Sequence, residues 1–368
     1  EVYLNNADEA VKAKHKAAIH AAMDNYLKSG VFTAPRQCAI YLERSTPYHP
    51  IRRGLVLAVD LEKYDWNPQA RPLIRATEGT VPQRLPPRVD IRQDALLETS
   101  HICLLIDDEE DLLIPSLAEE AKKNHHLYNT TLMMNSGTAA GWAVDSETAL
   151  NILADGLETL ARKAEDRYGV KEKVPFLFAV GDGNHSLAAA KAVWEEYKAA
   201  HAGKPDLESD ARRFALVELE NLHDTGISFE PIHRIIFGAN PEKVLQALSR
   251  SKGFCVETVK QEGNCASIFR VIPNFADIAT VHVEPLLEEF IKQEGPNVYI
   301  DYIHGEDELH RLVSASAQEA RPTVGILLPP INKSGFFKTI ANNGPLPRKS
   351  FSMGEGIEKR FYLECRKI

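Results

Sequence analysis

The 368-residue sequence contains few cysteines and no cluster of them. Its five cysteines are scattered without any C-x-x-C spacing, which argues against a zinc site and against a disulfide framework. No apolar run approaches the roughly 20 residues that a membrane span needs, and no signal peptide is visible. The sequence opens on Glu1 rather than Met, so we expect the natural N-terminus to be missing. These features predict a cytoplasmic protein that does not associate with membranes.

Long blocks of positive charge are also absent. The formal net charge is −9, and no helix-turn-helix pattern or basic arm is visible. Because non-specific nucleic-acid binding depends on neutralising phosphates with Lys and Arg, we expect no nucleic-acid partner. The sequence also lacks the six-residue dinucleotide fingerprint and the Gly-x-x-x-x-Gly-Lys-Ser/Thr loop. Small ligands are favoured, and a length of 368 residues indicates two or three domains.

One stretch, residues 176–194, predicts a buried strand, a glycine turn and a helix. Five apolar residues run into the turn, and helical spacing of apolar residues follows it. The first amides of such a helix bind anions, because they lack partners and lie at the positive end of the helix dipole. We expect Asp182 or Asn184 to cap this helix. The predicted phosphate-binding residues of the turn are Asp182, Gly183, Asn184 and Ser186, with His185 as a catalytic candidate.

A second candidate segment is the run at residues 75–80, where Arg75 and Glu78 lie close to the hydroxyls of Thr77 and Thr80. A carboxylate beside arginines stays ionised and can serve as a general base, so Glu78 is the predicted catalytic carboxylate. Arg75, Thr77 and Thr80 are predicted to contact phosphate. A solvated basic loop is the alternative interpretation, because three more arginines follow and the nearby prolines make a continuous helix improbable there.

Further candidates are spread along the chain. Four acids at 107–110 follow a short apolar strand, and such a run either holds Mg²⁺ or, more often, opens a helix. On the first interpretation Asp108 and Asp182 are metal ligands. Arg234, with His233, is predicted either to bind phosphate or to pair with a core carboxylate. Cations beside glycine and serine in the C-terminal region add Arg348 and Lys349 to the predicted phosphate-binding residues.

The pattern of helices and strands predicts an α+β fold with a mixed-sheet core. Residues 1–74 form an N-terminal α+β unit with a hairpin, and residues 75–239 form the phosphate-binding core, including a helix over 146–168. Residues 240–335 alternate between helix and strand and predict a second small α/β domain. Residues 336–368 are expected to return to the core.

Several of these segments together resemble a known family. The turn at 182–185 and the alanines at 188–190 resemble the D-G-H/N-H-R-x-x-A signature of the ParB/sulfiredoxin-like superfamily, which includes the ADP-dependent free-serine kinases. The runs at 75–80, 101–108, 231–234 and 348–368 look like the long, largely uncharacterised bacterial branch of that family. This resemblance covers nearly the whole chain and implies the ParB-like core.

The resemblance also implies a reaction and a site. A phosphoryl group would pass from ADP, or ATP, to L-serine or a similar hydroxy compound, with Mg²⁺ accompanying the nucleotide, and a homodimer is compatible with it. Glu78 stands where the family's kinases carry the carboxylate that deprotonates serine. His185 would orient or neutralise the phosphate, and Asp182 would cap the turn or hold Mg²⁺. The motif's arginine is replaced by Ser186, so Lys191 or a distant arginine would have to supply that charge.

Three alternatives remain open. The chain could be a nucleotide-binding switch without catalysis, as the partitioning proteins of the superfamily are with CTP. It could be a metal-dependent phosphohydrolase that uses Asp107, Asp108 and Asp182. The third alternative is a scaffold whose site has decayed, which would show no thermal shift with nucleotide.

Overall fold

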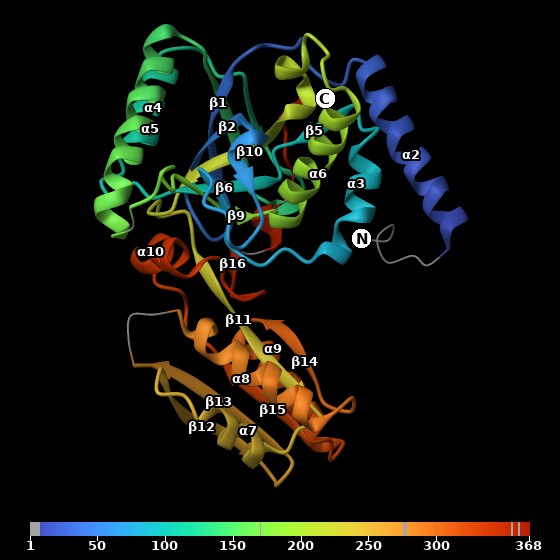
Figure 1. Cartoon of the computed structure of the whole chain (residues 1–368), viewed down its shortest axis with the longest axis vertical. Helices are drawn as coiled ribbons and strands as arrows, with labels where there is room; N and C mark the ends of the chain where they lie inside the picture. The colour runs from blue at the N-terminus through green and yellow to red at the C-terminus, as the bar shows by residue number, and fades with distance from the viewer. Residues whose placement is uncertain (1–7, 170, 275–277, 355, 360) are drawn as a thin grey trace. The chain divides into compact units, whose positions relative to one another are not determined.

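The structure, a computed structural model, describes residues 8–169, 171–274, 278–354, 356–359 and 361–368. The chain forms two compact units (Figure 1). Unit 1 comprises Glu1–Ile227 and Gly356–Ile368, and unit 2 comprises Ser228–Glu355. Each unit combines helices with a mixed sheet of parallel and antiparallel strands, so the predicted α+β class is confirmed.

Unit 1 is built on a nine-stranded sheet. In the order in which they lie side by side, its strands are β3 (Tyr64–Asp65), β4 (Ile74–Ala76), β9 (Phe178–Asp182), β6 (Ile102–Ile106), β10 (Phe214–Asn221), β2 (Arg52–Asp60), β1 (Ala39–Ser45), β8 (Thr138–Val144) and β7 (Tyr128–Thr131). The strands β5 (Leu97–Thr99) and β17 (Cys365–Lys367) form a separate antiparallel pair. The predicted hairpin is confirmed, because β1 and β2 pair antiparallel.

The helices of unit 1 are α2 (Glu9–Lys28), α3 (Pro86–Arg92), α4 (Leu113–Ala121), α5 (Glu147–Tyr168) and α6 (Asn184–Ala200). In Figure 1, α4 lies alongside α5, and α3 lies alongside α6. Helices α4, α5 and α6 share one hydrophobic core with alternate residues of the central strands, such as Leu104 and Val217. Alternation in a strand sends Cys103 and Glu218 to the opposite face of the sheet.

That opposite face is covered in part by the C-terminal segment, Gly356–Ile368. Phe361 packs against a small apolar cluster on β1, β2, β8 and β10. Glu364 accepts hydrogen bonds from Ser100 (3.0 Å) and from Tyr128. Residues 214–221 of β10 are therefore covered on both faces, and all of them after Phe214 are buried. The strand of this segment, β17, lies at its end, at Cys365–Lys367.

Unit 2 has three layers, with a six-stranded sheet between helices. Five strands lie in the order β12 (Phe254–Glu262), β13 (Ala266–Pro273), β15 (Thr323–Leu327), β11 (Phe229–Phe237) and β14 (Tyr299–His304), and β16 (Phe351–Met353) pairs with β11. Ile236 packs on one face with α7 (Pro241–Leu248) and α8 (Ala279–Glu294). Its neighbour Ile235 packs on the other face with α9 (Glu306–Gln318), and α10 (Lys333–Asn343) follows β15.

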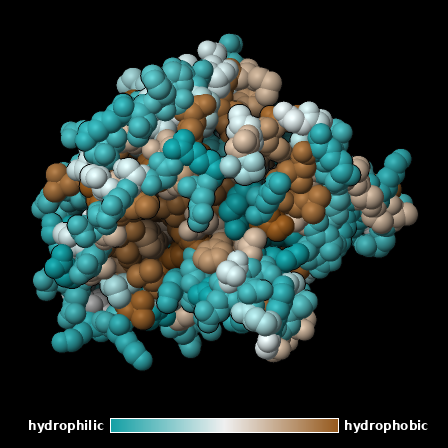
Figure 2. Space-filling view, turned by 90° about the horizontal axis from the view of Figure 1, so that it is seen from above, coloured by the Kyte–Doolittle hydropathy of each residue, from teal (hydrophilic) through white to brown (hydrophobic). Residues whose placement is uncertain are grey.

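Three further observations bear on the expectations from sequence. All five cysteines are free, which confirms the prediction of no disulfide. Among the described residues, no helix combines the length and apolarity that crossing a membrane requires. On the face shown in Figure 2, hydrophilic side chains predominate and smaller groups of hydrophobic side chains lie between them.

Candidate functional site

The candidate site is the turn at which β9 becomes α6. Gly183 is the N-cap of α6 and has φ 88°, a left-handed conformation that favours glycine. A Cβ at this position would lie 3.2 Å from Ile102 Cα, so the backbone of β6 also leaves little room for a side chain. The predicted strand, glycine turn and helix are therefore confirmed.

The predicted cap is wrong. Within the described part of the chain, the N-cap makes no side-chain capping hydrogen bond to α6. Asp182 Oδ1 instead accepts the N–H of Gly183 at 2.8 Å, one residue before the helix begins. By helix geometry the amides of Asn184, His185 and Ser186 have no intrahelical partner, so they are oriented toward any anion at the helix start.

The loop that follows β4 is tied to this turn at two points. Asn184 Oδ1 accepts the N–H of Thr77 at 3.1 Å, and Asn184 Nδ2 donates to Thr77 Oγ1 at 3.2 Å. His185 Nε2 accepts the N–H of Val81 at 3.2 Å. Loop 77–81 therefore starts and ends on the first turn of α6, which puts the half-buried Glu78 beside it. The structure thus brings together residues that lie more than a hundred positions apart in the sequence.

The hydrogen bond to Val81 fixes the protonation state of His185. A backbone N–H can only donate, so Nε2 must be the unprotonated nitrogen and the ring is neutral while this bond exists. His185 therefore holds loop 77–81 in place and contributes no positive charge to the turn. Thr80, on the same loop, has a buried hydroxyl oxygen for which no hydrogen-bond partner exists among the described residues. A buried hydroxyl without a partner is uncommon in folded proteins.

Positive charge reaches the turn from the C-terminal segment. Lys359 Nζ lies 2.9 Å from Asp182 Oδ2, and both side chains are partly exposed. The sequence showed a basic run at 358–360 but gave no sign that it returns to β9. Lys191, the expected substitute for the motif's arginine, pairs instead with Glu195 at 2.6 Å on its own helix.

Arg75 is not directed at the turn. Its partner on β9 is Ala179, four residues before Gly183, and its side chain is 95% buried. The guanidinium pairs with Glu172 and lies 4.5 Å over the ring of Phe176. The structure therefore gives Arg75 a carboxylate and an aromatic ring as partners, rather than the helix start.

Four predicted phosphate-binding residues belong to unit 2, where they form a cluster of their own. Arg234 is fully buried, pairs with Glu284 at 2.9 Å and donates to the carbonyl of Lys349 at 3.0 Å. The guanidinium of Arg348 lies 5.6 Å from the ring centroid of Tyr302. The interpretation of Arg234 as the partner of a core carboxylate is the one that the structure supports.

His233 is buried beside this cluster. Its Nδ1 accepts the N–H of Leu328 at 3.2 Å, and burial lowers the pKa of its imidazole to about 4. The ring is therefore neutral near pH 7 and cannot neutralise a phosphate there.

The two predicted metal ligands, Asp108 and Asp182, do not lie together. Cys103 of β6 pairs with Asp182, and β6 then runs on to Ile106 before the chain reaches Asp108. Asp108 Oδ2 accepts the amides of Leu112 and Leu113 at 2.8 and 2.9 Å, which makes it the carboxylate that opens α4. The second interpretation of the acidic run, a helix start, is the correct one for Asp108.

Another group of ligand atoms does come together near the end of β6. One ligand atom each of Asp107, Glu109 and His223 lies within 4.8 Å of the others, a spacing that could hold a metal ion. In the structure the Asp107 carboxylate is already bonded to His223 (2.7 Å) and to Tyr168 (2.9 Å). Burial opposes ionisation of Asp107, but these bonds and the nearby Arg167 lower its pKa overall. The arrangement is therefore an ion-paired network that a metal would have to displace.

A buried acidic group continues from the turn across the sheet. Glu218 of β10, Cys103 of β6 and Asp182 of β9 form one cross-strand row, with Glu220 two residues along β10. Arg52 lies 3.3 Å from Glu218 and 2.7 Å from Glu220. Burial and the charge of Glu218 raise the pKa of Glu220 to about 8, and Cys103 Sγ donates to its carboxyl group at 2.8 Å. Sequence analysis missed these glutamates because each is flanked by apolar strand residues.

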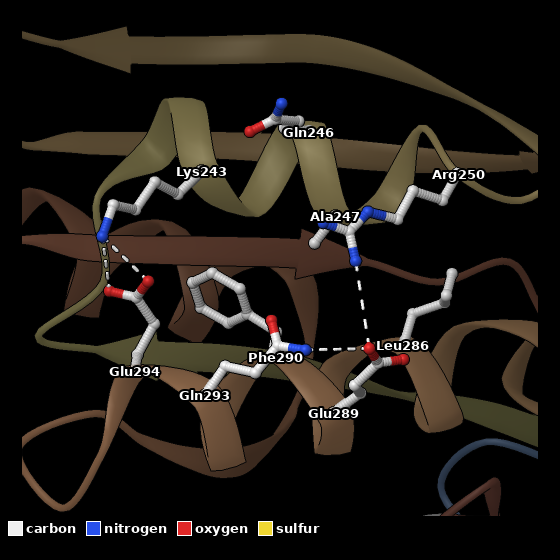
Figure 3. A pocket seen from close by; sticks show the side chains of 9 residues that line it. All are labelled: Lys243, Gln246, Ala247, Arg250, Leu286, Glu289, Phe290, Gln293 and Glu294. Carbon is white, nitrogen blue, oxygen red and sulfur yellow. Dashed lines mark hydrogen bonds and ion pairs between the residues drawn. The ribbon is translucent and has the colours of Figure 1, made fainter.

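A surface groove in unit 2 lies between α7 and α8 and has a volume of about 170 Å³ (Figure 3). Its charged side chains are paired: Lys243 with Glu294 at 2.8 Å, and Arg250 with Glu289 at 4.0 Å. These pairs are exposed ion pairs of the kind that contributes little energy, and none adjoins a nucleophile or a perturbed acid. The groove therefore carries no proposal of its own.

The structure is therefore that of a two-unit α/β protein. In unit 1, the first turn of α6 is bonded to the loop that carries Glu78. The chain belongs to the family described as Protein of unknown function (DUF1015), whose model matches residues 1–325. A comparison with curated proteins finds no matching sequence.

Three solved structures share low similarity with the chain. A conserved hypothetical protein from Pyrococcus furiosus is 11% identical, with 85% of this chain and 94% of that chain covered and a TM-score of 0.37. Free serine kinase in complex with AMP is 11% identical, with 81% and 87% covered and a TM-score of 0.38. A mutant of free serine kinase in complex with ADP is 13% identical, with the same coverage and TM-score. Similarity at this level does not establish a shared activity.

Proposed function

We propose that the chain is a nucleotide-dependent phosphotransferase that passes a phosphoryl group from ADP or ATP to the hydroxyl of L-serine or a similar small molecule. The observation that carries the proposal is the attachment of loop 77–81 to the first turn of α6 through Asn184 and His185. This attachment supports Glu78 as the candidate base, because Glu78 belongs to the loop that is bonded to these amides' own helical turn.

Each group at the turn has a role in the proposed transfer. The amides of Asn184, His185 and Ser186 bind the oxygens of the phosphoryl group, and the hydroxyl of Thr80 is available as a further donor. Glu78 accepts the proton of the acceptor hydroxyl as its oxygen bonds to phosphorus. The bond from phosphorus to the bridging oxygen breaks, and AMP leaves with the electron pair when ADP is the donor. Positioning and charge neutralisation suffice for this chemistry.

The predicted protein ligands of Mg²⁺ do not fit that role. Asp182 is engaged at both oxygens, by the N–H of Gly183 and by Lys359. Asp108 caps α4. We therefore assign no step of the transfer to a metal held by these residues. The same geometry removes the basis for a phosphohydrolase built on Asp108 and Asp182.

The test is product formation with a panel of acceptors. The full chain is incubated with ADP or ATP, Mg²⁺ and individual amino acids, and ³¹P NMR detects the phosphorylated product. We expect O-phosphoserine together with AMP or ADP, and a loss of roughly 10²- to 10⁴-fold in rate for Glu78→Gln, since that variant lacks the base. Nucleotide binding without product across the panel would overturn the transferase proposal in favour of the ligand-controlled switch.

A further inference from the structure

The turn that is proposed to hold phosphate is surrounded by carboxylates. Asp182 precedes Gly183 directly, Glu78 lies on the loop attached to the turn, and Glu218 lies two strands away in the row of Asp182. A helix N-terminus supplies the equivalent of only about half a positive charge. His185 adds none while it accepts the N–H of Val81. A nucleotide carrying two or three negative charges therefore needs a cation from another part of the chain.

Lys359 is placed to supply that charge. Asp182 accepts the N–H of Gly183 with one oxygen and contacts Lys359 Nζ with the other, at 2.8 and 2.9 Å. A single carboxylate group therefore separates the ammonium from the turn. The side chain of Lys359 is 31% exposed and that of Asp182 is 45% exposed, so the pair is accessible to a solute. The ammonium of a lysine is carried on a flexible four-carbon stem, so it can move between neighbouring anions.

Two other described cations of unit 1 are largely buried and lie beside carboxylates. Arg52 is 12% exposed and lies between Glu218 and Glu220. Arg75 is 5% exposed and is paired with Glu172. These groups neutralise buried carboxylates, and moving either would leave a buried charge uncompensated.

The segment that carries Lys359 is anchored on both sides. Glu358 accepts a hydrogen bond from Thr46 Oγ1 at 2.7 Å, and the guanidinium of Arg44 lies 5.8 Å from the ring centroid of Tyr362. Farther on, Glu364 is bonded to Ser100 and Tyr128. Glu358, Tyr362 and Glu364 are therefore held to the sheet of unit 1, and we expect the side chain of Lys359 to be the part that responds to a ligand.

We infer that Lys359 is a phosphate-binding residue of this site: on nucleotide binding its ammonium contacts the phosphoryl group held by the first turn of α6, and Asp182 positions it. The inference rests on the proposed function, because it assigns the cation of the same site. It also explains how the turn works with serine at position 186. The ligand class that Lys359 selects is a phosphate ester or anhydride.

The test compares ADP affinity among variants of the full chain by isothermal titration calorimetry. We expect Lys359→Met to weaken ADP binding about 10- to 100-fold, which corresponds to the loss of a charge-assisted contact. Lys359→Arg should stay within about threefold of the natural protein. The matched control is Lys198→Met, which removes a lysine of similar exposure (34%) that pairs with Glu62 and Glu195 on the far end of α6. It should leave ADP affinity unchanged.

A rescue experiment separates charge from structure. Lys359→Cys, alkylated with 2-bromoethylamine, regains an ammonium at nearly the same position and should regain most of the ADP affinity, with the alkylated natural protein as reference. Equal ADP affinity of Lys359→Met and the natural protein would overturn the inference. So would a Lys359→Cys protein that alkylation fails to rescue.

The outcomes also distinguish this inference from the proposed function. Weakened ADP binding in Lys359→Met without any phosphorylated product would retain Lys359 as a phosphate-binding residue and reject the transferase. A natural protein that binds no ADP at all would reject both.

Discussion

The polar side chains of the two units differ in the partners that they bind. In unit 1, Asn184 and His185 use their side chains to hold a neighbouring loop at the half-exposed start of a helix. In unit 2, Arg234 is fully buried and its charge is matched by Glu284, which also accepts a hydrogen bond from Tyr302. The first arrangement leaves helix amides oriented toward a ligand, whereas in the second the charge of Arg234 is already matched by a carboxylate, although its Nη2 has no hydrogen-bond partner among the described residues.

This difference teaches how to interpret a short polar motif. Both Asp-Gly-Asn-His at the turn and His-Arg at 233–234 are compatible with phosphate binding when only the sequence is known. The two motifs differ in their distant partners. Glu284, fifty residues beyond Arg234, is the anion that pairs with this arginine in place of a phosphate. In the described part of the chain, the N-cap of α6 makes no comparable side-chain hydrogen bond to the first amides of the helix.

The largest expected effect is that of Arg234→Met. It leaves Glu284 buried without its cation, so we expect the free energy of unfolding to fall by about 3–5 kcal/mol. Urea denaturation followed by circular dichroism measures this. The double variant with Glu284→Leu should recover much of the loss. ADP affinity of the folded protein should not change, and a stable Arg234→Met protein that had lost ADP binding would erase the distinction between the units.

The units should also respond to pH in opposite directions. Glu220 in unit 1 has a pKa raised to about 8 by burial and by Glu218. Above the unfolded value of 4.5 the unfolded chain loses this proton while the folded chain keeps it. The contribution of Glu220 to the free energy of unfolding therefore falls as pH rises from 4.5 to 8, by up to about 1.4 kcal/mol per pH unit.

His233 in unit 2 has the reverse behaviour. Burial lowers its pKa from 6.5 to about 4, so below pH 6.5 the unfolded chain binds a proton that the folded chain does not bind. The contribution of His233 is present above pH 6.5 and is lost as pH falls toward 4. Compared with the natural protein, the slope of the unfolding free energy against pH should be more positive between pH 4.5 and 8 in Glu220→Gln and more negative between pH 4 and 6.5 in His233→Gln. The same change in slope in both variants would contradict the assignment.

Asn184→Ala should disturb both stability and binding. It leaves the buried amide of Thr77 without an acceptor, which costs about 1–3 kcal/mol, and it frees the loop that carries Glu78. The matched variant in unit 2 is Asn240→Ala, which removes the N-cap of α7 at a cost of about 1 kcal/mol. Thermal unfolding and ADP titration are measured on both. Only Asn184→Ala should lose ADP affinity, and equal affinities would break the comparison.

The smallest expected effect on stability is that of Gly183→Ala. The left-handed backbone at Gly183 costs an alanine about 1–2 kcal/mol, and its Cβ would meet Ile102 at 3.2 Å. Gly263→Ala is the control in unit 2, because Gly263 has φ 60° and no atom within 4 Å of the added Cβ. Both variants should lose stability by thermal unfolding, but only Gly183→Ala should shift the turn and weaken ADP binding.

Local patterns in the sequence predicted local structure well. The helix expected over 146–168 is α5, where Ser146 accepts the N–H of Ala149 at 3.1 Å and Gly169 ends the helix with φ 69°. The prolines at 82–87 were expected to interrupt a continuous helix, and the chain there forms a 3₁₀ helix at Pro82–Arg84 followed by α3, whose first turn holds Pro86 and Pro87. In the region that was expected to alternate between helix and strand, α8 begins at Ala279 and contains Pro285 in its interior.

The site itself was predictable only in part. The turn follows from adjacent residues, so periodicity and glycine sufficed to find it. The approach of Glu78 was expected only from the family resemblance. The contact of Lys359 with Asp182 joins residues that are 177 positions apart, and nothing in a basic run tells which strand end it will meet. The sequence alone could not distinguish Arg234 from a phosphate-binding arginine, because its partner Glu284 lies on a distant element, α8.

The most direct test of the central claim follows the backbone amides during an ADP titration by ¹H–¹⁵N NMR. If the first turn of α6 binds the phosphate, the amide resonances of Asn184, His185 and Ser186 should shift most, together with those of loop 77–81. Saturating shifts confined to the residues around Arg234 and Lys349, with the α6 amides unmoved, would contradict the account.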